Sequence, residues 1–259
     1  MDLGIGGRKA IVCASSKGLG RGCAMALAEA GVAVVVNGRD EATLAETAAE
    51  IADRFKVPVT PVTADIGTRA GQEALIAACP EPDILVNNNA GPPRRDFREL
   101  DREAMIDGVI MNMITPIELI QRTLDGMAER GFGRIVNITS ISVKMPLAGL
   151  DLSSGARAGL TAFLAGICRT VADRNVTINN LLPGMFDTER LRAGFPAQAR
   201  LQGRSAEEVA RERAREVPAG RFGDPGEFGR ACAFLCSAHA GYITGQNILI
   251  DGGLFKSAF

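Results

Sequence analysis

Residues 9–40 constrain the fold of this chain more than any other segment. A short apolar run at 9–13 leads into a turn at 14–20 that contains two glycines, and small and apolar residues then continue at helical spacing to about Ala30. A second apolar run at 32–36 ends just before Arg39. A strand, a glycine-bearing turn and a helix in this order present backbone N–H groups and a positive helix end to a phosphate. The segment therefore predicts a nucleotide-binding unit.

Short apolar, β-branched runs alternate with helical patterns along the rest of the chain. Strands are expected at 9–13, 32–36, 59–63, 83–87, 134–138, 177–182 and 246–250. Further helices are expected at 40–55, 68–78, 101–130 with a bend near Pro116, and 154–173. Such alternation is typical of a parallel sheet covered on both faces. We predict an α/β fold, a doubly wound parallel sheet of seven strands in a single domain spanning 1–259.

Composition narrows the class of protein. The net charge of -1 provides no basic surface for nucleic acid. No apolar run approaches the ~20 residues of a membrane span, and the first residues do not read as a signal peptide. We expect a cytoplasmic protein with six reduced cysteines. Cys232, Cys236 and His239 could share one helix face, but their apolar surroundings favour core packing, so no metal site is predicted.

Ligands of doubly wound sheets bind beyond the carboxyl ends of the strands. Every motif-like stretch of this chain is expected at that edge. These stretches are the glycine turn, Arg39, Asp65, the run 88–91, Thr139-Ser140 and Pro183-Gly184. Their coincidence at one edge is stronger evidence for a site than any one of them.

The segment 189–217 interrupts the βα alternation. It carries seven arginines and five glutamates, and Ser205 with Glu208 has the spacing of a capping box that opens a helix to about Glu216. An insertion that follows a strand would cover the ligand site as a substrate lid. A solvated helical excursion is the alternative, and the sequence does not separate the two.

Taken together, several motifs resemble the short-chain dehydrogenase/reductase family, in the form that includes the 3-oxoacyl-carrier-protein reductases. The motifs are the glycine turn, Asp65, Asn88-Asn89-Ala90-Gly91, Asn112, Asn137-Ile138-Thr139-Ser140, the stretch from Asn180 through Pro183-Gly184 to Thr188, the run 221–225, and 242–246 with Asp251-Gly252-Gly253. The resemblance covers essentially the whole chain. It implies a Rossmann-type domain that binds a nicotinamide dinucleotide, usually as a homotetramer or dimer.

The resemblance also assigns cofactor residues. The pyrophosphate would bind at Ala14, Ser15, Ser16, Lys17, Gly18, Leu19 and Gly20. The adenine would be bordered by Asp65 and Ile66, the adenosine ribose side by Asn89, and the nicotinamide by Pro183, Gly184 and Thr188. Ala90, Gly91 and Arg157 would also belong to the cofactor site. Cations at Lys17 and Arg39 favour NADP over NAD, because a 2′-phosphate needs cationic donors; the neighbouring Asp40 is the residue that argues for NAD.

Two departures from the family pattern stand out. Ala14 replaces the first glycine of the turn, which alanine can do only with a negative φ. More seriously, the catalytic Tyr-x-x-x-Lys falls on Ser153 and Arg157, and the only tyrosine, Tyr242, belongs to a different motif. The resemblance leaves Ser140 to orient a carbonyl and Asn112 to hold a water chain.

The substitutions change the chemistry that the site can perform. A serine hydroxyl is too weak an acid to replace a phenol of pKa about 10, and it is shorter by a ring. Arg157 could hold ribose hydroxyls and stabilise an alkoxide, but it cannot shuttle protons. Water relayed through Ser153, or one of Asp151, Lys144 and Asp187, would have to supply the proton.

Three functions remain open on these residues. The first is an NADP(H)-dependent oxidoreductase acting on a small carbonyl or secondary alcohol, such as a 3-oxoacyl thioester. The second is a nucleotide-binding pseudoenzyme that senses or scaffolds without turnover. A lyase or dehalogenase is the third, and Ser153 with the retained glycine turn argues against it.

Arg94 and Arg95 could attract a carboxylate, a phosphate or an acidic carrier protein, or could simply be solvated.

Overall fold

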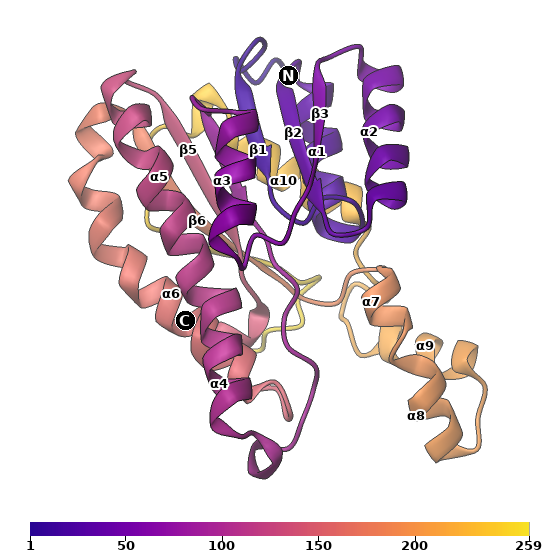
Figure 1. The fold of residues 1–259 in the computed structure, drawn as a ribbon. Coiled ribbons are helices and arrows are strands. Elements are labelled where there is room, and N and C mark those ends of the chain that lie inside the picture. The colour runs from indigo at the N-terminus through magenta and orange to yellow at the C-terminus, as the bar shows by residue number, and fades with distance from the viewer. Residues whose placement is uncertain (259) are drawn as a thin grey trace.

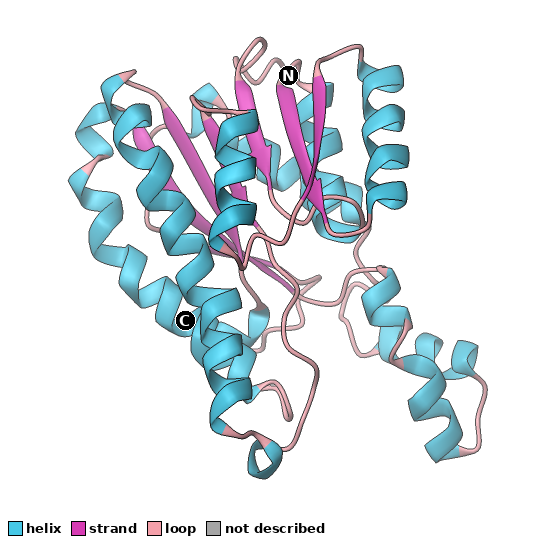
Figure 2. Ribbon diagram, in the orientation of Figure 1, coloured by secondary structure: helices cyan, strands magenta, loops and turns pink. Residues whose placement is uncertain are grey.

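A computed structural model describes residues 1–258 and confirms the predicted fold class (Figures 1 and 2). Within those residues, parallel strands form one seven-stranded sheet in the order β3-β2-β1-β4-β5-β6-β7. The strands are β1 (Lys9–Val12), β2 (Ala33–Gly38), β3 (Val59–Thr63), β4 (Ile84–Asn87), β5 (Gly133–Ile138), β6 (Val176–Pro183) and β7 (Asn247–Ile250). Each lies within two residues of its predicted bounds.

Helices pack on both faces of the sheet (Figure 2). The α-helices of the described chain are α1 (Gly18–Glu29), α2 (Glu41–Phe55), α3 (Arg69–Ala78), α4 (Arg102–Val109), α5 (Thr115–Glu129), α6 (Asp151–Ile167), α7 (Glu189–Arg192), α8 (Phe195–Gln202), α9 (Ala206–Arg215) and α10 (Pro225–Cys236), of which α7, α8 and α9 lie away from the sheet. Alternate strand residues supply two cores: Ala10 and Val12 face α1, α2 and α10, whereas Ile11 faces α3, α5 and α6. No helix of the described chain is both long and apolar enough to cross a membrane.

The helix expected at 101–130 is interrupted where the proline predicted. Between α4 and α5 lies a π-helical turn, Ile110–Ile114, and Pro116 stands in the first turn of α5. Proline has no N–H to bond the carbonyl four residues earlier, and its ring crowds that carbonyl, which here belongs to Asn112. The wider π turn is a common way to absorb that defect. It holds Asn112 in the buried interior.

Other helix bounds differ from the prediction. The helix expected at 154–173 is α6, which begins at Asp151 and ends at Ile167, so it includes both Ser153 and Arg157. Four residues apart, these two side chains share one face of α6. Further along, α10 contains Cys232 and Cys236, for which the sequence allowed a shared helix face, but it ends at Cys236, so His239 lies outside it.

The charge-rich segment folds as three short helices that project away from the sheet (Figure 1). The predicted capping box is confirmed: Ser205 accepts from the N–H of Glu208, and the Glu208 carboxylate accepts from the N–H of Ser205. Phe195, Ala199 and Val209 form a small separate core between α8 and α9.

Backbone contact between α1 and α10 depends on two glycines. A Cβ on Gly22 would lie 2.2 Å from the carbonyl oxygen of Pro225, and one on Gly229 would lie 2.1 Å from that of Gly22. Helices this close have room only for hydrogen atoms at the crossing. The contact fixes α1, and with it the glycine turn, against the C-terminal part of the chain.

Replacing Gly22 by alanine should therefore destabilise the fold, by about 1–3 kcal/mol or more, because α1 and α10 must separate. Gly166, exposed on α6, has no atom within 4 Å of the position of a Cβ, so Gly166→Ala is the matched control. That variant should gain about 1 kcal/mol from helix propensity. Denaturant unfolding of both variants measures the difference, and equal effects would contradict the close packing.

Candidate functional site

The predicted cofactor residues lie at the carboxyl edge of the sheet. Ala14 to Lys17 follow β1, Arg39 follows β2, Asp65 and Ile66 follow β3, Asn89 to Gly91 follow β4, and Gly184 and Thr188 follow β6. Because all strands are parallel, these segments meet at one edge. The sequence prediction of a shared location is confirmed; what each residue binds stays a prediction.

Ala14 corrects one expectation. Its φ is +44°, in the left-handed region, rather than negative. A non-glycine residue there costs roughly 1–2 kcal/mol. The conformation is held by two side chains: Asn37 Oδ1 accepts from the Ala14 N–H (3.1 Å), and Asn88 Nδ2 donates to the Ala14 carbonyl (3.1 Å). Alanine thus takes the glycine-like geometry of the turn under strain.

The N-terminus of α1 is open to an anion. Lys17 at the N-cap makes no side-chain capping bond, and the first turn contains no acidic residue. The following helices, α2 and α3, are capped by Asp40 and Thr68. Uncapped amides at Gly18 and beyond suit a pyrophosphate, so the edge fits the dinucleotide that the sequence predicted.

The two predicted phosphate cations stand at the rim of this edge. Lys17 Nζ pairs with Glu189 Oε2 of α7 at 3.0 Å, and Arg39 lies 4.0 Å from Asp65 Oδ2. Asp40 accepts from the N–H and hydroxyl of Thr43, and these bonds lower the pKa of its carboxyl group. Asp40 therefore caps α2 through Oδ1 and stays ionised beside Lys17.

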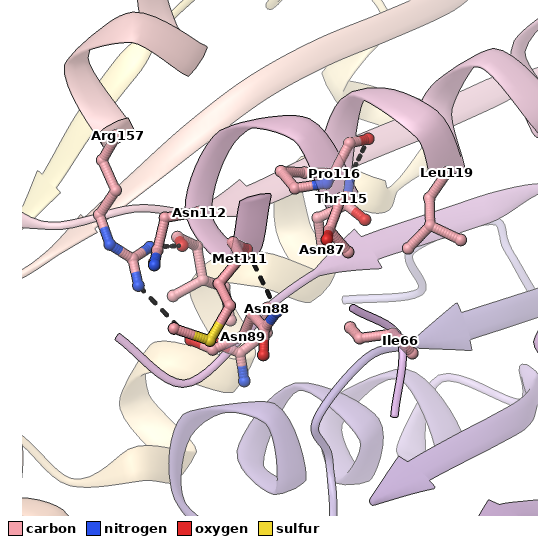
Figure 3. A pocket seen from close by; sticks show the side chains of 11 residues that line it. Ile66, Asn87, Asn88, Asn89, Met111, Asn112, Thr115, Pro116, Leu119 and Arg157 are labelled. Atoms are coloured by element: carbon pink, nitrogen blue, oxygen red, sulfur yellow. Dashed lines mark hydrogen bonds between the residues drawn. The ribbon is translucent and has the colours of Figure 1, made fainter. Parts of the chain in front are cut away.

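Behind the edge lies a small polar cavity (Figure 3). The cavity volume is about 20 Å³. Its lining residues are Ile66, Asn87, Asn88, Asn89, Met111, Asn112, Thr115, Pro116, Leu119, Ile138 and Arg157. Three buried oxygens around it lack a protein partner: Oδ1 of Asn87, Oδ1 of Asn112 and Oγ1 of Thr115. The size and the orphaned acceptors suit one water molecule.

Arg157 is turned into the protein, next to this cavity. Its Nη1 donates to the Ile138 carbonyl (2.6 Å), its Nη2 to the Asn89 carbonyl (3.4 Å) and its Nε to Ser153 Oγ (3.2 Å). Burial, with a smaller contribution from Arg190, lowers the pKa of Arg157 to about 10, so the guanidinium stays charged at neutral pH. Arg157 ties α6 to the ends of β4 and β5 instead of standing open to a ribose.

Two serine hydroxyls retain a free proton. Ser140 Oγ accepts from the Ser142 N–H (3.0 Å), which caps a 3₁₀ turn, and Ser153 Oγ accepts from Arg157. In both serines the accepting bond leaves the O–H free to donate. Ser140 therefore caps the 3₁₀ turn and can still donate to a ligand.

The other proposed proton donors are poorly suited. Asp187 is bound by Arg192, which lowers the pKa of that carboxyl group. Lys144 Nζ lies 5.7 Å from the Phe255 ring, and Asp151 is exposed at the start of α6. Tyr242 is fully exposed in the loop before β7, at the amino edge of the sheet, away from the site as expected.

One residue of this site was missed by the sequence patterns. Arg190 of α7 donates from Nη2 to the carbonyls of Gly91 (3.0 Å) and Pro92 (3.5 Å). It is one of seven arginines in a charge-rich segment, and nothing in the sequence distinguishes it from the others. Arg190 can be identified as a residue of the site only from the position of α7 beside Gly91 and Pro92.

The cysteines form no site with His239. Cys232 and Cys236 are fully buried, and the His239 Nε2 lies 2.9 Å from the Asp2 carbonyl. Within residues 1–258, no group of three or more His, Cys, Asp or Glu could hold a metal ion.

A Rossmann-type sheet with an open helix terminus and hydroxyl donors at one edge defines the class: a dinucleotide-binding oxidoreductase fold. The family model described as enoyl-(acyl carrier protein) reductase matches residues 13–255. The 3-oxoacyl-[acyl-carrier-protein] reductase FabG of Vibrio harveyi is 32% identical over 254 residues, covering 98% of this chain and 99% of the relative. The chain belongs to the short-chain dehydrogenase/reductase family, as its motifs predicted.

Related proteins use a phosphorylated cofactor. The NADPH-dependent reductase BacG of Bacillus subtilis is 30% identical over 255 residues, covering 96% of this chain and 98% of the relative. L-Sorbose reductase from Gluconobacter frateurii, solved with NADPH and L-sorbose, superposes with a TM-score of 0.94 at 28% identity, covering 99% of this chain and 100% of that one. These relatives are reductases whose names specify NADPH.

Ala14→Gly should raise the free energy of unfolding by up to about 1 kcal/mol, because the relief of left-handed strain exceeds the entropy that glycine adds to the unfolded chain. Ala45→Gly, in the exposed interior of α2, is the matched control and should lose about 1 kcal/mol. Denaturant unfolding distinguishes them. Equal losses in both variants would show that Ala14 is not strained.

Proposed function

We propose that this protein is an NADPH-dependent reductase of a small carbonyl compound, which also oxidises the corresponding secondary alcohol. The observation that carries the proposal is the uncapped N-terminus of α1 beside Lys17 and Arg39, at the edge where Ser140 follows β5. The NADPH named for the relatives supports it. Residues 14–20, Arg39, 65–66, 89–91, 183–184 and Thr188 would hold the cofactor.

NADPH, when bound, supplies a hydride to the carbonyl carbon. Ser140 and Ser153 each offer an O–H to the carbonyl oxygen. The Arg157 guanidinium donates to Ser153 Oγ and places a buried positive charge behind that hydroxyl. A fixed charge in a water-poor site stabilises the negative oxygen as it develops. The residues thus contribute stabilisation of an alkoxide in place of an acidic phenol.

The proton reaches that oxygen from the solvent side. Arg157 lies between Ser153 and the cavity that Asn112 lines, and a guanidinium does not release its proton at neutral pH. A water held by Asn112 therefore cannot be relayed through residue 157. It would instead keep Asn112 and Thr115 satisfied, and water at the open edge protonates the product.

We assign residues 189–217 to a lid of the single domain. Thr188 lies against Gly18 of the cofactor turn, and Glu189 pairs with Lys17 across the edge. These contacts support a lid over a solvated excursion.

We further assign the protein to the cytoplasm, because its six cysteines are free. We assign it to a homo-oligomer, because large apolar residues are exposed on α4 and α6, among them Met105, Ile106 and Phe163.

Arg39→Gln should weaken NADPH binding about tenfold and leave NADH binding nearly unchanged, because it removes one charge-assisted bond to the 2′-phosphate. Fluorescence titration with each cofactor measures this. Arg69→Gln, which removes an exposed arginine from α3, is the control and should change neither affinity. Equal weakening of both cofactors would contradict the role of Arg39.

Ser140→Ala should lower kcat about 10²-fold with NADPH affinity retained, because one donor to the oxyanion is lost. Ser154→Ala is the matched control, since its hydroxyl donates within α6 to the Leu150 carbonyl. Steady-state NADPH oxidation with a panel of ketones and 3-oxoacyl thioesters measures both. An unchanged rate in Ser140→Ala would remove Ser140 from the mechanism.

Ser153→Tyr/Arg157→Lys should raise turnover by up to about 10²–10⁴-fold, the usual contribution of a general acid. Arg157→Lys alone should bring no gain.

A second candidate function is a nucleotide-binding protein without turnover, which is favoured by one observation: all three guanidinium nitrogens of Arg157 donate to protein acceptors. NADPH binding with no oxidation in either protein would support that candidate.

A further inference from the structure

We infer that the natural substrate carries an anionic group, a carboxylate or a phosphate, close to its carbonyl, and that Arg190 binds that group. The inference rests on the proposed function, because it concerns the substrate of the same site. It is carried by a cluster of three arginines, Arg94, Arg157 and Arg190, gathered around the loop that follows β4. We call these the arginine cluster.

Arg190 and Ser153 face the same small space beside Gly91. A Cβ built on Gly91 would lie 2.9 Å from Arg190 Nη2 and 3.5 Å from Ser153 Oγ. Arg190 comes from α7 and Ser153 from α6, so the two sides of the site meet at this glycine. A molecule whose carbonyl oxygen accepts from Ser153 therefore has a guanidinium within reach of a neighbouring substituent.

The arginine cluster has no acidic partner. Among the ion pairs of residues 1–258, none includes Arg94, Arg157 or Arg190, although most other arginines near the site are paired. The two carboxylates closest in sequence to Arg190 are taken, Glu189 by Lys17 and Asp187 by Arg192. Both pairings leave Arg190 the uncompensated cation of α7.

The arginines of the cluster also repel one another. After desolvation, the second cause that lowers the pKa of Arg157 is the charge of Arg190, and Arg94 lowers the pKa of Arg190 in the same way. An anion placed here would relieve the repulsion and complete the electrostatics of the site.

The shape and chemistry of Arg190 favour a planar or tetrahedral oxyanion. Its Nη2 donates to the Gly91 and Pro92 carbonyls, so Nε and Nη1 remain available, and each can donate a charge-assisted hydrogen bond to a carboxylate or phosphate oxygen. Pro92, Leu150 and Leu152 surround Ser153 on this side, together with Arg95.

Anion binding at Arg190 would compensate for the missing phenol. A substrate fixed at both its carbonyl and its charged end is held in one orientation, and proximity of this kind can replace part of the rate that an acid provides. The positive cluster additionally stabilises an alkoxide. Small oxo acids and phosphorylated hydroxyketones combine a carbonyl group with an oxyanion in one short molecule.

The test compares pairs in which one member has the anionic group and the other has none. The carboxylate pair is acetoacetate and ethyl acetoacetate, and the phosphate pair is dihydroxyacetone phosphate and dihydroxyacetone. Calorimetric binding to the NADP⁺-loaded protein, together with NADPH oxidation, is measured for wild type and for Arg190→Gln. Arg200→Gln, which removes an exposed arginine of α8 from the same lid, is the control.

In the wild type, the charged member of at least one pair should bind about 10–100-fold more tightly than its neutral partner. Arg190→Gln should abolish that preference with little effect on the neutral compound, and Arg200→Gln should keep it. The pair that shows the preference distinguishes carboxylate from phosphate. Equal binding of charged and neutral partners, or a preference that survives in Arg190→Gln, overturns the inference.

The two proposals fail separately in this experiment. Calorimetry decides the anion site even if no compound is reduced, whereas NADPH oxidation decides the reductase function. Turnover without charge preference leaves the reductase and removes the anion site. Charge-dependent binding without turnover keeps the anion site and moves the function to nucleotide-dependent sensing. If NADP⁺ does not bind, calorimetry on the free protein applies the same charge criterion.

Discussion

The buried guanidinium of Arg157 fixes the centre of this site. A charge taken out of water is costly unless hydrogen bonds replace its hydration. Arg157 meets this requirement without a carboxylate, through the carbonyls of Ile138 and Asn89 and the hydroxyl of Ser153. These three acceptors belong to β5, the loop after β4, and α6. One side chain therefore holds the end of β5, the loop after β4 and helix α6 in fixed positions relative to one another.

That arrangement changes what the site can do chemically. The family pair of tyrosine and lysine transfers a proton, whereas a serine backed by a fixed cation stabilises charge. The polar cavity beside Asn112 survives, with its unpartnered oxygens, but Arg157 separates it from Ser153. Under the proposed function, a water in this cavity would satisfy the unpartnered oxygens without passing a proton to Ser153.

Helix α7 joins the two halves of the site. Glu189 reaches the cofactor turn at Lys17, and the next residue, Arg190, reaches the loop at Gly91. Adjacent side chains on a short helix can contact opposite walls only where those walls approach each other. The cofactor turn itself is strained at Ala14, and the bonds from Asn37 and Asn88 hold it in the shape that glycine would take freely.

The sequence by itself determined the sheet, its strand bounds, the bend at Pro116 and the location of the site. These follow from local patterns: apolar strand runs, a proline without an N–H, and the rule that parallel strands end at one edge. It also identified Ser153 and Arg157 as the unusual pair, because their positions are anchored by neighbouring motif residues.

Tertiary structure alone decided the sign of φ at Ala14, the inward direction of the Arg157 side chain, and which arginine of 189–217 contacts the site, namely Arg190. Each depends on contacts between segments far apart in the chain: Asn37 and Asn88 on Ala14, Asn89 and Ile138 on Arg157, and Gly91 on Arg190. Local patterns specify which face of an element is apolar, but they contain no information on which distant carbonyl a long cationic side chain will meet. That choice is made by the packing of α6 and α7 around one loop.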